Sequence, residues 1–205
     1  MNAVNKITAS LATAIAERGK ASFVVPGGSS PFGIFSALVN GDYSAFVNWS
    51  KVTITLVDDR LVPNDHQDSN HKLIRSQLLV GPVAAAQLLP LTADGFDKKI
   101  DLPFDVMLLG MGSDGHFASL FPSMVGKAAM TLSTVPAIIE TGPQGNPLWP
   151  RISMNLSMIL RSRLVVLLVR GPGKKDVLDA AKTDRSLPVH HLISQTVKSV
   201  QIVTD

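Results

Sequence analysis

The chain has 205 residues, of which 45% are hydrophobic and 17% are charged, and its formal net charge is +3. This composition excludes an intrinsically disordered chain, and the length is typical of a protein that buries one hydrophobic core. We therefore expect a single domain over residues 1–205. The sequence contains no cysteine, which excludes disulfides, thiolate catalysis and cysteine-ligated metal sites.

The apolar segments indicate neither export nor a membrane span. The longest branched-apolar run, residues 164–169, is far shorter than the ~20 residues that cross a bilayer. At the start of the chain, Val4, Ile7, Leu11 and Ile15 recur at helical spacing among polar residues, unlike the continuous apolar block of a signal peptide. We expect a helix there and a cytoplasmic protein.

The basic residues are scattered in pairs, such as Lys98 with Lys99 and Lys174 with Lys175. This pattern gives no support for a nucleic-acid surface, whereas a small positive excess suits the attraction of a small anionic substrate. We expect a small-molecule partner, no nucleic acid and no membrane, and a monomer or weak homo-oligomer.

Strand-like and helix-like segments alternate along the chain. The expected strands are residues 21–25, 52–57, 104–109, 164–169 and 199–203. The expected helices between them are residues 32–39, 69–79 and 173–182. Such alternation predicts an α/β fold of the Rossmann-like kind, with a mostly parallel sheet flanked by helices.

Two segments have informative boundary residues. The helix at 69–79 has Asp68 and Ser69 as candidate N-caps and Gly81-Pro82 as its stop. Residues 141–150 contain two glycines and three prolines, which predicts a loop. This loop is not expected to be a domain linker, because too little chain follows it to form a second core.

Residues 26–31 follow a strand and open a helix. Glycines such as Gly28 let backbone N–H groups approach an anion, and Ser29 adds a hydroxyl donor. Pro31 suits the first helical position, where its missing N–H is not needed. The segment therefore predicts a phosphate site, although a purely structural turn would have the same pattern.

Residues 104–116 carry a more informative pattern. The strand ends in a turn with glycines at 110, 112 and 115, and this turn delivers Asp114 and His116 to the carboxyl edge of the sheet. The glycine spacing also fits a dinucleotide site, but the acidic residue expected ~20 positions later is absent. A lone histidine is often structural, whereas this placement favours a catalytic base.

Further charges stand at segment ends. Asp58, Asp59 and Arg60 close the second strand, where a solvated charged turn is the alternative interpretation. Arg151 follows the proline-rich segment and Lys174 begins a helix, and each alone could be a surface charge. Together with the turn at 26–31, these two cations would complement a doubly charged phosphate.

With these residues identified, the sequence resembles the 6-phosphogluconolactonase family along nearly its whole length. The landmarks, in order, are residues 27–31, 58–60, 62–63, 69–70, 109–122, 151–153, 173–174 and 187–188. The long motif at 109–122 is highly specific. The resemblance implies a Rossmann-like fold and hydrolysis of a sugar-phosphate lactone in the oxidative pentose phosphate pathway, without metal or cofactor.

The resemblance also implies roles for individual residues. His116 matches the base that activates water, with Asp114 orienting it, and Arg60 and Asp58 match groups that line the site. The implied phosphate-binding residues are Gly28, Ser29, Arg151 and Lys174. Arg60 or backbone N–H groups could hold the oxyanion. Ser30 and Asp59 depart from the family pattern, which has threonine and glutamate there.

Two alternatives come from the same fold. Glucosamine-6-phosphate deaminases have a glutamate that assists ring opening at the position of Phe121, and a phenylalanine cannot move a proton. A non-catalytic sugar-phosphate effector domain would have little reason to keep both Asp114 and His116. No metal is expected either, since the remaining histidines lack a ligand-like spacing with carboxylates.

Overall fold

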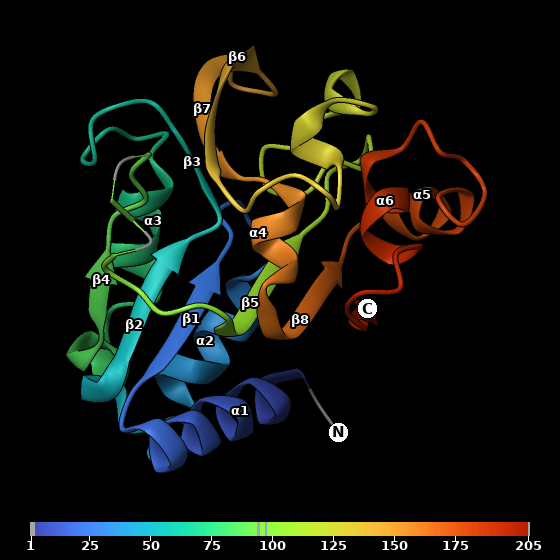
Figure 1. Ribbon diagram of the computed structural model, residues 1–205. Coiled ribbons are helices and arrows are strands. Elements are labelled where there is room, and N and C mark those ends of the chain that lie inside the picture. The colour runs from blue at the N-terminus through green and yellow to red at the C-terminus, as the bar shows by residue number, and fades with distance from the viewer. Residues whose placement is uncertain (1–2, 94, 97, 205) are drawn as a thin grey trace.

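The computed structural model describes residues 3–93, 95–96 and 98–204. Its centre is a six-stranded sheet in the order β4-β2-β1-β5-β8-β9, in which every pair of neighbours is parallel (Figure 1). The strands are β1 (Ala21–Val25), β2 (Val52–Leu56), β4 (Gln87–Leu89), β5 (Phe104–Gly110), β8 (Ser162–Val169) and β9 (Val200–Thr204). The expected parallel sheet is confirmed, and β4 is an addition that the sequence did not indicate.

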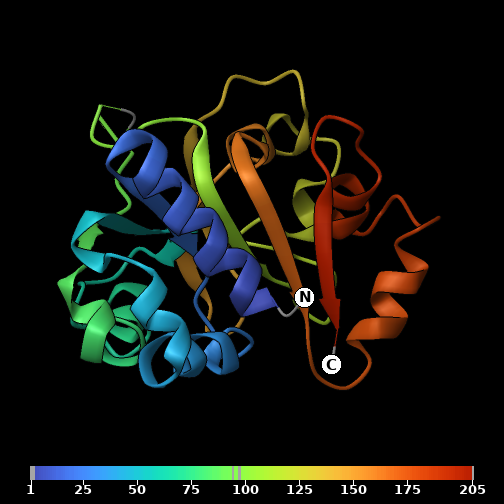
Figure 2. The same ribbon diagram turned by 90° about the horizontal axis from the view of Figure 1, so that it is seen from below.

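Helices and irregular segments cover both faces of this sheet. The helices are α1 (Ala3–Arg18), α2 (Phe32–Asn40), α3 (Asn70–Gln77), α4 (Leu156–Leu160), α5 (Lys174–Ala180) and α6 (Pro188–Ile193). Helix α1 crosses β1, β5 and β8 on one face (Figure 2). All five residues of β1 and the first six of β5 are buried, so these strands are near-continuous apolar runs.

The helix boundaries follow capping chemistry. Ser69 is the N-cap of α3, and its side chain accepts a hydrogen bond from the Lys72 backbone N–H at 3.4 Å. Pro31 lies one position earlier than expected, because it is the N-cap of α2 and the helix begins at Phe32. The helices expected at 32–39, 69–79 and 173–182 are thus present within a few residues of those bounds.

A second, antiparallel sheet stands on the carboxyl edge of the first. It consists of β3 (Asp58–Arg60), β7 (Trp149–Met154) and β6 (Ile138–Gln144), in the order β3-β7-β6. The prediction of a loop at 141–150 is therefore wrong, since most of these residues belong to a β-hairpin. A register shift between Thr141 and Gln144 accommodates Pro143, which cannot donate to a regular ladder.

One residue joins the two sheets. The Val57 backbone N–H donates to the Val25 carbonyl at 3.0 Å, and the Val57 carbonyl accepts from Met154 N–H at 2.9 Å. The strand order of the large sheet reverses between β1 and β5, where α/β folds form a crevice at the carboxyl ends. Among the described residues, no helix is long and apolar enough to cross a membrane.

Candidate active site

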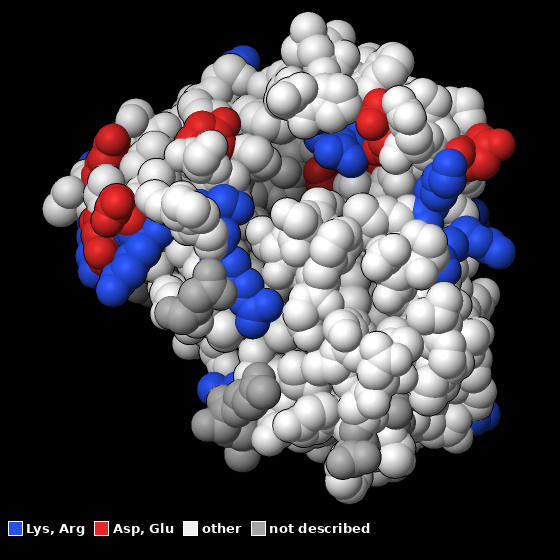
Figure 3. Space-filling view, turned by 180° about the vertical axis from the view of Figure 1, so that it is seen from behind, with Lys and Arg blue, Asp and Glu red and all other residues white. Residues whose placement is uncertain are grey.

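A cavity of about 240 Å³ opens at this reversal point. Its walls come from the turn after β1, the turn after β5, strands β3 and β7, and the first residues of α3 and α5. Charged side chains gather in the upper part of the face seen in Figure 3, whose lower half is mostly uncharged. The cavity brings together seven of the expected site residues: Gly28, Ser29, Asp58, Arg60, His116, Arg151 and Lys174.

The turn after β1 forms one wall. Phe32 N–H donates to the Ser29 carbonyl at 3.2 Å as the chain enters α2, so Gly28 and Ser29 lie at the start of that helix. The Lys174 ammonium, from the first residue of α5, lies 3.5 Å from the Ser30 hydroxyl. A cation, two hydroxyls and a helix N-terminus therefore face the same space, which suits a phosphate.

Opposite this turn stands His116. Its Nδ1 lies 2.5 Å from Oδ1 of Asp114, which also accepts the His116 backbone N–H at 3.2 Å. Asp114 is thus the eighth expected residue, and it contacts the cavity through His116. The two side chains lie flat against Gly112, where any Cβ would overlap the imidazole ring. The glycine is required here for close packing.

Asp114 has an altered pKa. Its partial burial favours the protonated form, but the hydrogen bond and charge of His116 outweigh burial and lower the pKa of Asp114 below its ordinary value. Asp114 is therefore a carboxylate at neutral pH. A carboxylate that accepts from Nδ1 selects the tautomer in which Nε2 is free to accept a proton.

Phe121 packs against His116. The two ring centroids lie 4.6 Å apart, and the Arg151 guanidinium lies 5.6 Å from the centre of the Phe121 ring. The aromatic ring therefore separates an imidazole from a guanidinium. From the sequence, Phe121 is notable only for the acid that it replaces, because a packing role leaves no chemical signature.

Arg151 is largely held by protein groups. Its Nε donates to the Gln144 carbonyl and its Nη2 donates to the Pro147 carbonyl, each at 3.1 Å, so the β6–β7 hairpin fixes the side chain. Burial and the nearby charge of Arg60 lower the pKa of Arg151, although an arginine remains a cation at neutral pH. Arg151 lines the cavity as expected, with fewer free donors than a surface arginine.

Asp58 lies at the floor of the cavity. Its Oδ2 accepts a 2.6 Å hydrogen bond from the hydroxyl of Ser119, a fully buried residue that the sequence did not single out. Burial raises the pKa of Asp58 above its ordinary value, against the lowering effects of Ser119, Arg151 and Arg60. Next to Ser119, Ala118 has a φ of +48°, a left-handed conformation that is strained for alanine and common at functional sites.

Asp59 does not line the cavity, and its carboxylate binds the N-terminus of helix α3. Its carboxylate accepts the backbone N–H groups of Asn70 and His71 at 2.6 and 3.0 Å, and the Ser69 hydroxyl at 3.2 Å. A carboxylate at a helix N-terminus satisfies donors that have no partner inside the helix. The adjacent residues Asp58 and Asp59 therefore have separate tasks.

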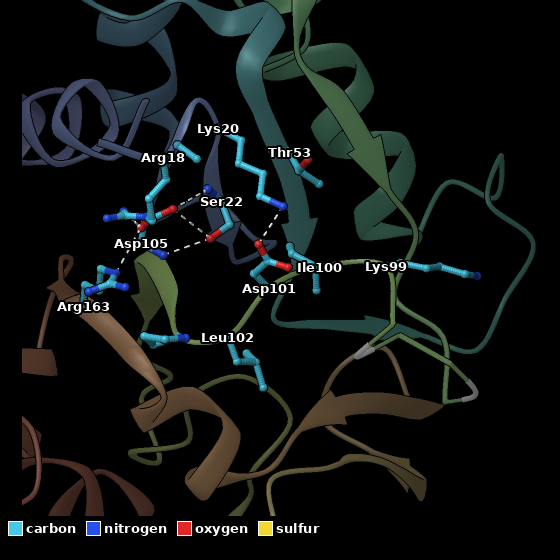
Figure 4. Close-up of a pocket in the computed structure, with 12 residues that line it drawn as sticks. Arg18, Lys20, Ser22, Thr53, Lys99, Ile100, Asp101, Leu102, Asp105 and Arg163 are labelled. Carbon is cyan, nitrogen blue, oxygen red and sulfur yellow. Dashed lines mark hydrogen bonds and ion pairs between the residues drawn. The ribbon is translucent and has the colours of Figure 1, made fainter. Parts of the chain in front are cut away.

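A larger cavity, of about 430 Å³, lies at the opposite edge of the sheet (Figure 4). There Asp105 accepts from Arg18 Nη2 at 2.5 Å and from Ser22 N–H at 2.8 Å, and Arg163 Nε lies 3.4 Å away. Lys20 pairs with Asp101 at 2.6 Å across its rim. The two carboxylates of this cavity are therefore already paired with arginine or lysine side chains of the protein.

The remaining histidines make other contacts. His190 and His191 lie within hydrogen-bond distance of the Ala181 and Arg185 carbonyls, at 2.7 and 2.9 Å. His66 packs edge-on against Trp149. In the described part of the chain, no group of three or more His, Asp or Glu side chains is arranged to hold a metal ion.

Comparison with known proteins identifies the family of this chain. Residues 1–201 match the family described as glucosamine-6-phosphate isomerases/6-phosphogluconolactonase, and the chain belongs to this family. Within it, similar relatives are lactonases. The chain is 36% identical to the 6-phosphogluconolactonase of Caulobacter vibrioides, over 98% of this chain and 90% of the relative. It is 35% identical to that of Rhizobium meliloti, over 96% and 89%.

The fold is also that of a known lactonase. The crystal structure of a 6-phosphogluconolactonase from Shewanella baltica OS155 is 31% identical, with a TM-score of 0.82 over 98% of this chain and 90% of that chain. The resemblance and the fold class inferred from the sequence are thus confirmed.

Proposed function

We propose that the chain hydrolyses 6-phospho-D-glucono-1,5-lactone to 6-phosphogluconate, with His116 as the base that activates water. The observation that carries the proposal is the pairing of His116 with Asp114 in a cavity that Lys174 and Ser29 also line. One side of the cavity offers a proton acceptor and the other offers anion donors. Such an arrangement suits a substrate with an electrophilic carbonyl at one end and a phosphate at the other.

In this scheme the reaction is an addition followed by an elimination. Water attacks the lactone carbonyl carbon and gives a proton to Nε2 of His116, while Asp114 stabilises the imidazolium that forms. The tetrahedral oxyanion is held by the Arg60 guanidinium, which lines the cavity and makes both of its side-chain hydrogen bonds to described residues through Nη1, so that Nη2 remains for the substrate. The bond between the carbonyl carbon and the ring oxygen then breaks, and the proton passes from His116 to the leaving oxygen.

The phosphate is assigned to the opposite wall. Lys174, Ser29 and the backbone at Gly28 bind it, and Arg151 adds positive charge from the hairpin side. Charge-assisted hydrogen bonds of this kind fix one end of the substrate and hold its other end near the base.

Phe121 argues against the deaminase alternative. The position expected to hold a ring-opening acid is occupied by a buried phenyl ring between His116 and Arg151. No proton can be moved by this side chain, so glucosamine 6-phosphate should not be deaminated.

The test measures both activities in parallel. Purified protein is added to freshly made 6-phosphogluconolactone, and proton release is followed with the spontaneous rate subtracted. Ammonia release from glucosamine 6-phosphate is measured with the same preparation. We expect the first activity without the second. Ammonia release without lactone hydrolysis would replace the proposal with the deaminase, and neither activity would favour a binding domain.

A further inference from the structure

The Arg60 side chain is held by Asn70, a residue for which the sequence predicts no catalytic role. Among the described residues, both side-chain hydrogen bonds of Arg60 are made by Nη1, which donates to Oδ1 of Asn70 and to the Asp68 carbonyl at 2.9 Å each. Nε has no partner among the described residues but is buried, so Nη2 is the donor that Arg60 can offer to a ligand in the cavity that it lines. One side of Arg60 is thus fixed by the protein while another donor is left without a protein partner.

The Asn70 side chain is itself fixed from several directions. Its Nδ2 donates to the Asp58 carbonyl at 3.0 Å, and its backbone N–H donates to Asp59. Only 3% of Asn70 is exposed, and the amide lies so close to Gly27 that a Cβ there would overlap it. From the first position of α3, the amide therefore contacts two other site segments at once: the turn after β1 and strand β3.

The same hydrogen bonds fix which end of the Asn70 side-chain amide faces Arg60. Since Nδ2 must face the Asp58 carbonyl, Oδ1 must face Arg60, and the amide cannot flip without facing like groups toward like groups on both sides. A neutral acceptor orients a guanidinium while leaving its positive charge available to a developing oxyanion. A carboxylate in the same place would neutralise part of that charge.

We propose that Asn70 is a positioning residue for lactone hydrolysis, which fixes the Arg60 guanidinium so that its unpartnered donors face the substrate carbonyl oxygen. The inference rests on the proposed function and on the role of Arg60 in it. Because the oxyanion forms only in the transition state, loss of the positioning should lower kcat more than it raises KM.

The test is a double-mutant cycle on purified, folded protein. Asn70→Ala should lower kcat by about 10- to 100-fold, the scale of a small misplacement of a catalytic group, with a KM change of less than about threefold. In an Arg60→Ala background, Asn70→Ala should lower kcat by no more than about twofold further, because Arg60 is no longer there to be positioned. If Asn70→Ala does not fold, Asn70→Ser completes the same cycle.

Ser69→Ala is the matched control. It removes the N-cap of α3 and the hydroxyl contact to Asp59, but it does not contact Arg60. It should lower the melting temperature and leave kcat of the folded protein within about twofold. An equal loss of kcat in Ser69→Ala, or additive losses in the cycle, would overturn the positioning role. A wild-type rate equal to the spontaneous rate would overturn the proposed function, and this inference with it.

Discussion

The two edges of the central sheet carry similar kinds of charged residues in opposite arrangements. At the amino edge, Asp105 has Arg18, Ser22 and Arg163 around it, so this carboxylate and the two arginines meet partners from the protein (Figure 4). At the carboxyl edge, no hydrogen bond to a described residue engages Nη2 of Arg60 or Nε2 of His116. The larger cavity is at the amino edge, and the smaller one holds the candidate site.

The comparison shows that unpaired polar groups locate a ligand site better than the volume of a cavity does. A self-paired network stabilises the fold and offers a ligand little, since a ligand would first have to break existing pairs. Helix direction adds to the difference. The C-terminal end of α1 lies at the amino edge and disfavours anions, whereas the N-terminal end of α2 at the carboxyl edge attracts them.

The largest expected effect comes from removing the base at the carboxyl edge. His116→Ala should lower kcat by about 10²–10⁴-fold, the usual contribution of a positioned general base, and leave the fold intact. The measurement is steady-state lactone hydrolysis together with circular dichroism. His191→Ala, at a residue that does not line the cavity, is the control and should keep full turnover. A folded His116→Ala variant with normal kcat would remove His116 from the mechanism.

Loss of a phosphate ligand should have a smaller and selective effect. Lys174→Ala removes a charge-assisted contact of about 1.5–3 kcal/mol, so kcat/KM for the phosphorylated lactone should fall roughly 10- to 150-fold. Unphosphorylated gluconolactone should be hydrolysed as before, since it has no phosphate to lose. Lys175→Ala changes an exposed neighbour on the same helix and is the matched control.

Arg151→Ala should reduce the same preference, but it also removes two hydrogen bonds from the hairpin, so the melting temperature should fall as well. If both variants kept full preference for the phosphorylated lactone, the phosphate site would lie elsewhere.

At the amino edge the effect should be on stability alone. Asp105→Asn removes the carboxylate that Arg18 and Arg163 share, and should lower the free energy of unfolding by about 1–3 kcal/mol with kcat/KM unchanged. Asp101→Asn breaks only the exposed pair with Lys20 and should change stability little. Urea unfolding and lactone hydrolysis of both variants would test this. A fall in kcat/KM for folded Asp105→Asn would contradict the assignment of stability to the amino edge and of activity to the carboxyl edge.

The smallest effect is a pH dependence from Asp58. Burial raises its pKa, so the folded state binds the proton more tightly than the unfolded state and gains stability at low pH. This contribution is lost as pH rises from about 3.9, the ordinary unfolded value, through the raised folded value. The unfolding free energy of wild type minus that of Asp58→Asn should therefore decrease with pH over this window. Urea titrations from pH 4 upward would measure it, and a difference that rises with pH would disprove it.

Most of the central sheet was predictable because its strands are buried on both faces. β1, β5 and β8 are apolar runs bounded by turn residues, and such runs have few other interpretations. The β6–β7 hairpin was not predictable, because its prolines and glycines are the usual residues of loops. Its pairing depends on β3, which lies some 90 positions earlier in the chain.

The candidate site was predictable where charged or titratable side chains stand at the end of a strand or the start of a helix. His116, Arg60 and Lys174 belong to this group, and the cavity includes all three. Asn70, Ser119 and Phe121 were not, because an amide, a hydroxyl or a phenyl ring becomes informative only through what it touches. Ser119 meets Asp58 across 61 positions of sequence, and no local pattern contains that contact.

The position of the Phe121 ring also limits how this chain can evolve. Phe121→Glu would set a carboxylate against Arg151 on one side and His116 on the other, where it would form ion pairs with both and remove the neutral imidazole that hydrolysis needs. We expect that variant to lose lactone hydrolysis without releasing ammonia from glucosamine 6-phosphate. A lineage passing from one chemistry to the other by this substitution would cross an inactive intermediate, so selection would keep the two activities in separate branches unless Arg151 or the hairpin changed first.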